Sequence, residues 1–409
     1  MATDSTSTDK DNSFADQTML TPVAVRLLEE MGGKVLPSLM EEATGVSAKT
    51  WKAGGPQSPA VIRRAEAELI GRHLDRLQTH GGHSYDEAVA IHRATNWKER
   101  GTWLMFVRWE LMPNDSRRCP KTEELARTID ELDSQLTEFR LADDLVGYRQ
   151  LLLASGLLDV GDEWLRSVEE IDAGTLKRGG NASWDSLTPV INATLKVALL
   201  RLLACWDVEF QSRYLTESDK RRGLTPRPLF QYVLPALKTG AKLSADGKYP
   251  AHGLFRLPLR RAIELTYCLA TYHREKRWPK ANEVTRTMVA AAGGKTLHGE
   301  NHSEQPLAKI HLGSRGLTSA EFADIWQSMC GGKPDDKTPL PPWPVYVVAQ
   351  IWTVLFVEKG NRKNTPRAVS ITVQDDQWYR YWWDKYLAEF KRQGTFFGND
   401  PWPDYSAVI

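Results

Sequence analysis

Apolar side chains recur three and four residues apart over most of this chain, which is the period of a helix with one buried face. At residues 121–140, Leu125, Ile129, Leu132 and Leu136 would share that face. Thr318 followed by Glu321 is the pattern of a capping box at the start of another helix. Helices are predicted at 60–79, with Ile62 and Ala65 on the apolar face, and at 84–94, 121–140, 188–213, 257–276, 282–292, 318–329 and 376–392.

Strand patterns are scarce. Residues 345–357 are rich in β-branched side chains, but the length of the run favours a buried helix. Residues 367–373 alternate in the way of a short strand. The sequence therefore predicts a mostly α-helical protein of several subdomains, with at most a short hairpin or edge strand near 367–373.

Breaks rich in Gly and Pro divide the chain. Residues 1–17 are polar and are expected to form a disordered tail, because they cannot bury enough surface to offset their ordering entropy. The expected segments are an N-terminal helical domain at 18–115, an acidic helical segment at 116–180, a basic helical domain at 181–335 and a C-terminal helical segment at 336–409.

Composition is that of a globular protein, with 41% hydrophobic and 26% charged residues. No apolar run reaches the roughly 20 residues that span a bilayer, and the N-terminus lacks the pattern of a secretory signal. The four cysteines are far apart and form no CxxC pair. A cytoplasmic protein without membrane association is expected.

Charge is distributed unevenly. Residues 211–286 hold sixteen Lys and Arg against six Asp and Glu, a net of +10, whereas residues 1–210 have a net of −9. An acidic partner is expected to lower the positive potential of residues 211–286. That partner could be nucleic acid, another subunit or the acidic half of the same chain.

The clearest local motif is at residues 35–55. An apolar helix would end at Thr44 and Gly45, and Ser47 would cap a second helix. The phrase Thr-Gly-Val-Ser-x-x-Thr resembles the turn of bacterial and phage repressor-type helix-turn-helix domains. The resemblance implies a second helix that enters the major groove, with contacts to DNA from Ser47, Lys49, Thr50 and Lys52.

The motif departs from that family at one position. Glu41 stands where the family usually has a small buried residue, four positions before the glycine. The resemblance covers about twenty residues of the chain. The alternative is an ordinary helical hairpin with a Gly turn and a Ser cap.

The basic segment is the second candidate for nucleic-acid contact, because arginines interleaved with aromatic residues suit phosphate contact and base stacking. Its alternatives are ion pairs with the acidic helix or a second subunit, or a plain solvated surface. The candidate contacts are Lys220, Arg221, Arg222, Arg227, Arg260, Arg261, Arg274, Lys276, Arg277 and Lys280.

The helix expected at 376–392 is the most aromatic stretch of the chain. Its wide aromatic face could dock onto the chain's own core or onto another protein, since Trp and Tyr dominate binding hot spots. The candidate interface residues are Trp378, Trp382, Trp383 and Tyr386.

Catalytic and cofactor motifs are missing from the sequence. It has neither GxSxG nor GxGxxG, and Gly293-Gly294-Lys295-Thr296 lacks the earlier glycine of a phosphate-binding loop. His298, Glu300 and His302 have the wrong spacing for a zinc site of the HExxH type. Neither a metal nor a cofactor is predicted, and no enzyme activity is assigned.

Together these patterns predict a cytoplasmic, DNA-associated protein of a bacterial or phage-related regulatory or antiviral-defence type, acting by binding. Two alternatives stay open. The chain could be a helical subunit of a larger protein complex or a homo-oligomer, docking through the basic segment and the aromatic helix. It could also be an enzyme whose dispersed site has no recognisable motif.

Overall fold

Helices dominate the structure, as the apolar period predicts. The computed structural model describes residues 19–33, 36–53, 55–56, 58–81, 84–94, 102–112, 118–142, 144–156, 184–214, 224–225, 228–237, 255–275, 277, 279, 316–330, 342–356, 373–393 and 400–401. The predicted N-terminal tail and the helix predicted at 282–292 lie outside these residues.

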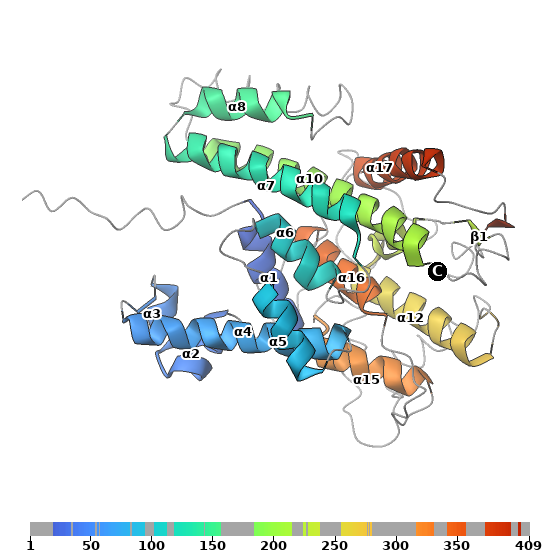
Figure 1. Cartoon of the computed structure of the whole chain (residues 1–409), viewed down its shortest axis with the longest axis horizontal. Coiled ribbons are helices and arrows are strands. Elements are labelled where there is room, and N and C mark those ends of the chain that lie inside the picture. Colours follow the sequence, from blue (N-terminus) through green and yellow to red (C-terminus); the bar gives the residue numbers. More distant parts are fainter. Residues whose placement is uncertain are drawn as a thin grey trace, which may run out of the picture.

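The helical elements follow one another along the chain as Figure 1 shows. They are α1 (Thr21–Gly32), α2 (Leu36–Thr44), α3 (Ala48–Lys52), α4 (Pro59–Gly81), α5 (Tyr85–Ala94), α6 (Thr102–Phe106), the π-helix η2 (Val107–Leu111), α7 (Pro120–Leu141), α8 (Leu145–Ala154), α10 (Trp184–Tyr214), the 3-10 helix η4 (Leu229–Val233), α12 (Pro258–Glu275), α15 (Ser319–Cys330), α16 (Trp343–Phe356) and α17 (Val373–Arg392).

Each helix predicted within the described residues is present, and the run at 345–357 is the buried helix α16 rather than a strand. The capping box at α15 is formed, since Glu321 Oε2 accepts from the Thr318 amide at 2.9 Å and Thr318 Oγ1 accepts from the Glu321 amide at 3.2 Å. One residue differs from its expected place. Ile62, assigned to the apolar face of α4, is exposed, whereas Ala65 is buried against Leu39 and Met40.

Strands are limited to four two-residue segments in the described part of the chain. β1 (Leu224–Thr225) pairs in parallel with β4 (Asp400–Pro401), and β2 (Ala236–Leu237) pairs antiparallel with β3 (Phe255–Arg256). Of the strand predicted at 367–373, residues 367–372 lie outside the described structure. Val373 opens α17, so the aromatic helix begins where the strand was expected to end.

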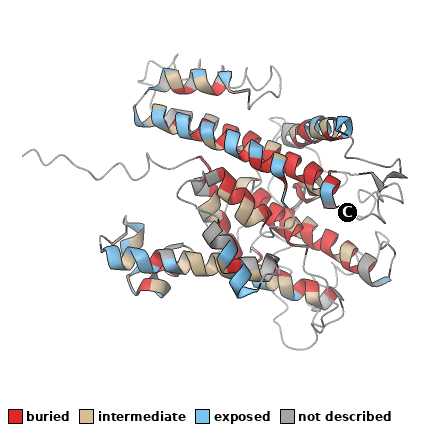
Figure 2. Cartoon of the chain, viewed as in Figure 1, coloured by how far each residue is buried: buried red, intermediate tan, exposed pale blue. Residues whose placement is uncertain are grey.

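Helix α10 lies at the centre of the main body, in contact with α7, α17 and η4. Helix α16 contacts α1 and α12 (Figure 1), and it also contacts η4. The largest cluster of buried side chains runs from Met19 to Phe390 and takes members from all four predicted helical segments. Among the described residues these segments therefore share one core, and Figure 2 shows the burial along α10 and α16.

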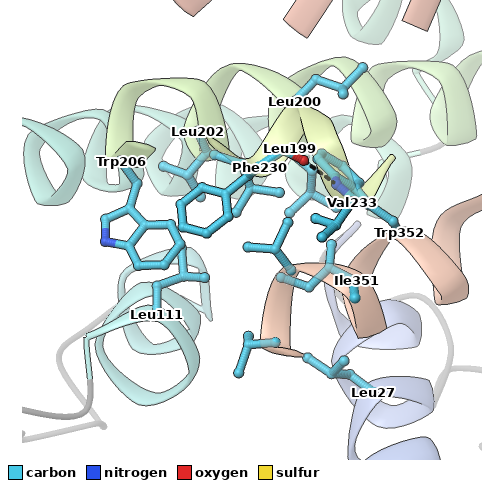
Figure 3. Packing of buried hydrophobic residues seen from close by; sticks show 14 of the residues in the cluster. Leu27, Leu111, Leu199, Leu200, Leu202, Trp206, Phe230, Val233, Ile351 and Trp352 are labelled. Atoms are coloured by element: carbon cyan, nitrogen blue, oxygen red, sulfur yellow. Dashed lines mark hydrogen bonds between the residues drawn. The ribbon is translucent and has the colours of Figure 1, made fainter. Parts of the chain in front are cut away.

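An aromatic stack joins three elements of this core. The ring of Trp206 on α10 lies parallel to that of Phe230 on η4, with centroids 4.7 Å apart. The Trp352 indole on α16 donates to the Phe230 carbonyl at 3.3 Å, as Figure 3 shows. Large aromatic side chains buried in this way contribute much of the hydrophobic stabilisation of a domain.

Carboxylates fix the helix ends around α7. Asp130 accepts from the amides of Trp103 and Leu104, the start of α6, at 2.8 and 2.9 Å. Glu209 on α10 accepts from the amides of Lys121 and Thr122, the start of α7. Amides in the first turn of a helix have no partner inside the helix, so a carboxylate from a neighbouring element stabilises the end.

Within the described residues, none of the helices has the length and apolar character needed to cross a membrane.

Candidate nucleic-acid interface

Helices α2, α3 and α4 form an arm that extends from the main body (Figure 1). Helix α2 ends at Thr44, and the Gly45 amide donates to the Glu41 carbonyl at 2.8 Å. Gly45 has φ 75°, a left-handed conformation that glycine adopts without steric cost. The chain therefore turns here as the sequence predicts.

Ser47 begins the second helix of the motif. Its side chain accepts from the Thr50 amide at 3.3 Å, so it is the N-cap of α3, and the two hydroxyl oxygens lie 3.0 Å apart. Both residues are exposed. Ser47 and Thr50 thus shape the start of α3 while remaining accessible to solvent.

Glu41, the residue that departs from the helix-turn-helix pattern, has a structural role. It is exposed, and its Oε2 accepts from the Ala48 amide in the first turn of α3 at 3.1 Å. A small residue at this position could not reach that amide. The carboxylate therefore joins α2 to α3 across the turn, and it also places a negative charge at the first turn of α3.

Trp51 sets the orientation of α3. It packs against the small cluster of Leu39, Met40 and Ala65, which joins α2 to α4. The chain leaves α3 through Gly55, whose amide donates to the Thr50 carbonyl at 3.0 Å and where a Cβ would lie 3.4 Å from the Trp51 ring. With Trp51 facing the arm, Lys49, Thr50 and Lys52 are exposed to solvent (Figure 2).

The first turns of α4 add positive charge to the arm. Arg63 and Arg64, which directly precede the buried Ala65, are exposed, and Arg63 Nε donates to the Pro59 carbonyl. Residues 47–65 contain four Lys and Arg and no Asp or Glu. Arg63 and Arg64 were not among the contacts predicted from the sequence, because they belong to the next helix. The absence of acidic residues from 47–65 is the sequence signal that indicates them.

The basic segment is only partly covered by the described residues. Lys220, Arg221, Arg222, Arg227, Lys276 and Lys280 lie outside them, as does the side chain of Arg274, and their assignment stays a prediction. The three candidate contacts whose side chains are described have partners within the chain. Arg260 Nε lies 3.0 Å from Glu264, Arg261 donates to the Leu234 carbonyl, and Arg277 lies 2.7 Å from Glu275.

These pairs also bear on the alternative of ion pairs with the acidic helix. Each of these three contacts joins two residues of the basic segment itself. On α7, Glu123 is held by Arg108, Arg118 and Arg127 instead. We therefore do not include Arg260 and Arg261 in the candidate surface.

The aromatic helix packs inward. Trp382 and Trp383 are fully buried, Trp378 and Tyr386 are partly buried, and α17 lies along α10. Arg201 on α10 lies over the Trp382 ring at 4.2 Å and donates to the Tyr386 hydroxyl at 3.0 Å. The structure corrects the assignment of Trp382 and Trp383 to a protein interface, because the core of the same chain covers them.

Comparison with known protein families, with curated proteins and with solved structures finds no match for this chain. No group of three or more His, Cys, Asp or Glu in the described ranges could hold a metal ion. His298, Glu300 and His302 lie outside those ranges.

Proposed function

We propose that this protein binds duplex DNA through the arm formed by α2, α3 and α4. The observation that supports the proposal is the orientation of α3. Trp51 faces the arm, so that Lys49, Thr50 and Lys52 face solvent together. Lysines and hydroxyl groups on a short helix at the end of an arm can contact phosphates and base edges.

The charge of the arm favours an acidic partner. Residues 47–65 have a net charge of +4, in a chain whose total is +1. Arg63 and Arg64 extend the exposed basic surface from α3 onto α4. Phosphate contacts supply most of the affinity of a protein for DNA, and base contacts add specificity. A regulatory or defence role would follow from such binding and stays a prediction.

The test is fluorescence anisotropy with a labelled duplex at several salt concentrations, comparing the wild-type chain with a K49Q/K52Q double variant. Each lysine that contacts a phosphate contributes about one unit to the slope of log K against log salt. The double variant should therefore bind more weakly and lose about two units of slope.

A matched control is K391Q/R392Q, which removes two exposed cations from the last turn of α17. This control should bind DNA as the wild type does. Equal binding and equal salt slopes for the wild type and K49Q/K52Q would show that α3 is not the contact. Absence of binding by the wild type at low salt would refute the proposal as a whole.

A further inference from the structure

Three arginines meet at one buried carboxylate beside the start of α7. Arg108 comes from the π-helix η2, Arg118 precedes α7, and Arg127 lies one turn beyond Glu123 on α7. Their Nη2 atoms lie 2.7, 2.7 and 3.3 Å from Glu123 Oε2, and Arg118 Nε also donates to Oε1 at 2.9 Å. Segments that are apart in the sequence therefore converge on a single anion.

Among the described side chains of this cluster, positive charge exceeds negative charge. Burial alone would raise the pKa of Glu123, but hydrogen bonds from Arg118 and Arg108 outweigh it and hold the pKa below its ordinary value. Glu123 is thus ionised and balances one of the three arginines. If Glu110, in the same π-helix, is counted as well, the group still carries a net charge of +1.

The neighbouring carboxylates have other partners. Glu124 lies 3.3 Å from Lys121 Nζ, and Glu209 lies 3.0 Å from Arg213 Nε and caps α7. Glu123 Oε2 already accepts from three guanidinium groups. In the described part of the chain the buried Nε of Arg108 has no acceptor. The cluster therefore contains a buried guanidinium N–H whose hydrogen-bonding capacity the described residues leave unused.

The three arginines differ in their exposure to solvent. The side chain of Arg108 is 15% exposed, whereas those of Arg118 and Arg127 are 43% and 53% exposed and can be reached from solvent. A planar guanidinium group offers two parallel N–H groups to a phosphate, and several such groups match a tetrahedral oxyanion. Glu123, which is 3% exposed, would lie beneath the ligand and hold the arginines in position.

We propose that Arg108, Arg118 and Arg127 form a binding site for a phosphate group, which Glu123 organises. The ligand class is a phosphate monoester or inorganic phosphate. The phosphate could belong to the end of a nucleic acid strand or to a small molecule. This site is on η2 and α7, uses none of the residues of α3, and does not depend on DNA binding by the arm.

The experiment is calorimetric titration of the full chain with inorganic phosphate at constant ionic strength, with chloride as the reference salt. The variants are R127Q and R118Q, and circular dichroism verifies their fold. Each should bind phosphate at least tenfold more weakly than the wild type. The control is R380Q, because Arg380 is 50% exposed and makes a similar pair, 3.1 Å from Asp384, on α17. R380Q should bind as the wild type does.

A second arm distinguishes the two sources of phosphate. A short single-stranded oligonucleotide with a 5′-phosphate is compared with the same oligonucleotide lacking it. Tighter binding of the phosphorylated strand, lost in R127Q, assigns the site to a nucleic acid end. Equal binding of the two strands, together with phosphate binding that R127Q weakens, assigns it to a small phosphate compound. If neither ligand distinguishes R127Q from the wild type, the proposal is wrong.

Discussion

The buried carboxylate of Asp207 accepts a hydrogen bond from the hydroxyl of Tyr379 at 2.9 Å, which joins α10 to α17 across the core. The same carboxylate accepts from the Phe230 amide at 3.3 Å and from Gln211. A carboxylate without solvent contact thus connects α10, η4 and α17. Its protonation and its partners give two of the predictions that follow.

The first prediction concerns pH. Burial raises the pKa of Asp207 to about 7, although its hydrogen bonds from Gln211, Phe230 and Tyr379 favour the charged form. An Asp in an unfolded chain has a pKa of about 3.9, so between about pH 4 and pH 7 the folded state binds more protons. The free energy of unfolding should therefore fall as the pH rises through this window, by up to about 1.4 kcal/mol per pH unit.

Urea unfolding between pH 5 and pH 8 tests this dependence. Burial also raises the pKa of Asp130, to about 6, and that of Asp133, and both act in the same direction. The informative quantity is therefore the difference between the wild type and Asp207→Asn, whose stability should vary less with pH. Identical pH profiles for the two proteins would contradict the assignment to Asp207.

The second prediction concerns the partner of that carboxylate. Tyr379→Phe removes the hydroxyl donor and leaves a buried oxygen of Asp207 with one hydrogen bond fewer. The free energy of unfolding should fall by about 1–3 kcal/mol. Tyr381→Phe, on the exposed side of the same helix, is the control and should change stability by no more than about 0.5 kcal/mol. Similar losses in both variants would mean that the Asp207 contact contributes nothing.

The third prediction concerns the carboxylate that caps α7. Glu209 accepts from the Thr122 amide at 2.8 Å and from the Thr122 hydroxyl at 3.0 Å, and it pairs with Arg213. Glu209→Gln removes the buried negative charge and replaces one carboxylate oxygen with an NH₂ group, which cannot accept a hydrogen bond. The free energy of unfolding should therefore fall by about 3 kcal/mol. Chemical denaturation would measure the loss, with Glu131→Gln on the exposed face of α7 as the control. A loss no larger than that of the control would show that the cap is dispensable.

The fourth prediction rests on the proposed DNA contact. Glu41→Gln retains an oxygen that can accept from the Ala48 amide, and it removes a negative charge at the first turn of α3. Two unit charges about 4 Å apart in water interact by about 1 kcal/mol, so without this repulsion duplex DNA should bind up to roughly fivefold more tightly at low salt. The gain should shrink as salt is added.

Glu42→Gln is the matched control for this comparison. Glu42 is an exposed neighbour on α2, and its replacement changes the net charge by the same amount. If the two variants tighten binding equally, net charge alone is responsible, and the position of Glu41 next to α3 has no special effect.

The helices could be predicted because their signals are local. The spacing of Leu125, Ile129, Leu132 and Leu136 defines the buried face of α7 whatever packs against it. The turn at Gly45 and the cap at Ser47 likewise depend on a few consecutive residues. The candidate contacts Lys49, Thr50 and Lys52 could be proposed from the sequence for the same reason.

Ion pairs and caps could not be predicted in this way. Arg260 and Arg261 appeared as surface cations because a charge count does not show which acceptor lies nearby. In the structure, Arg260 pairs with Glu264, and Arg261 donates a hydrogen bond to the Leu234 carbonyl. The aromatic face of α17 posed the same difficulty, since Trp382 is equally suited to a partner protein or to the core. Its contact with Arg201 on α10 depends on the packing of the two helices.

The amino-acid order by itself determined where the helices run and which side of each is apolar, since these follow from the geometry of neighbouring residues. Tertiary structure decided which acids of the negative half are buried, and it gave Asp133 an amide of Met19 and the indole of Trp103 as partners. Removing a carboxylate from water is tolerated only where donors from other segments surround it. Those donors come from segments far apart in the chain, so folding alone brings them together.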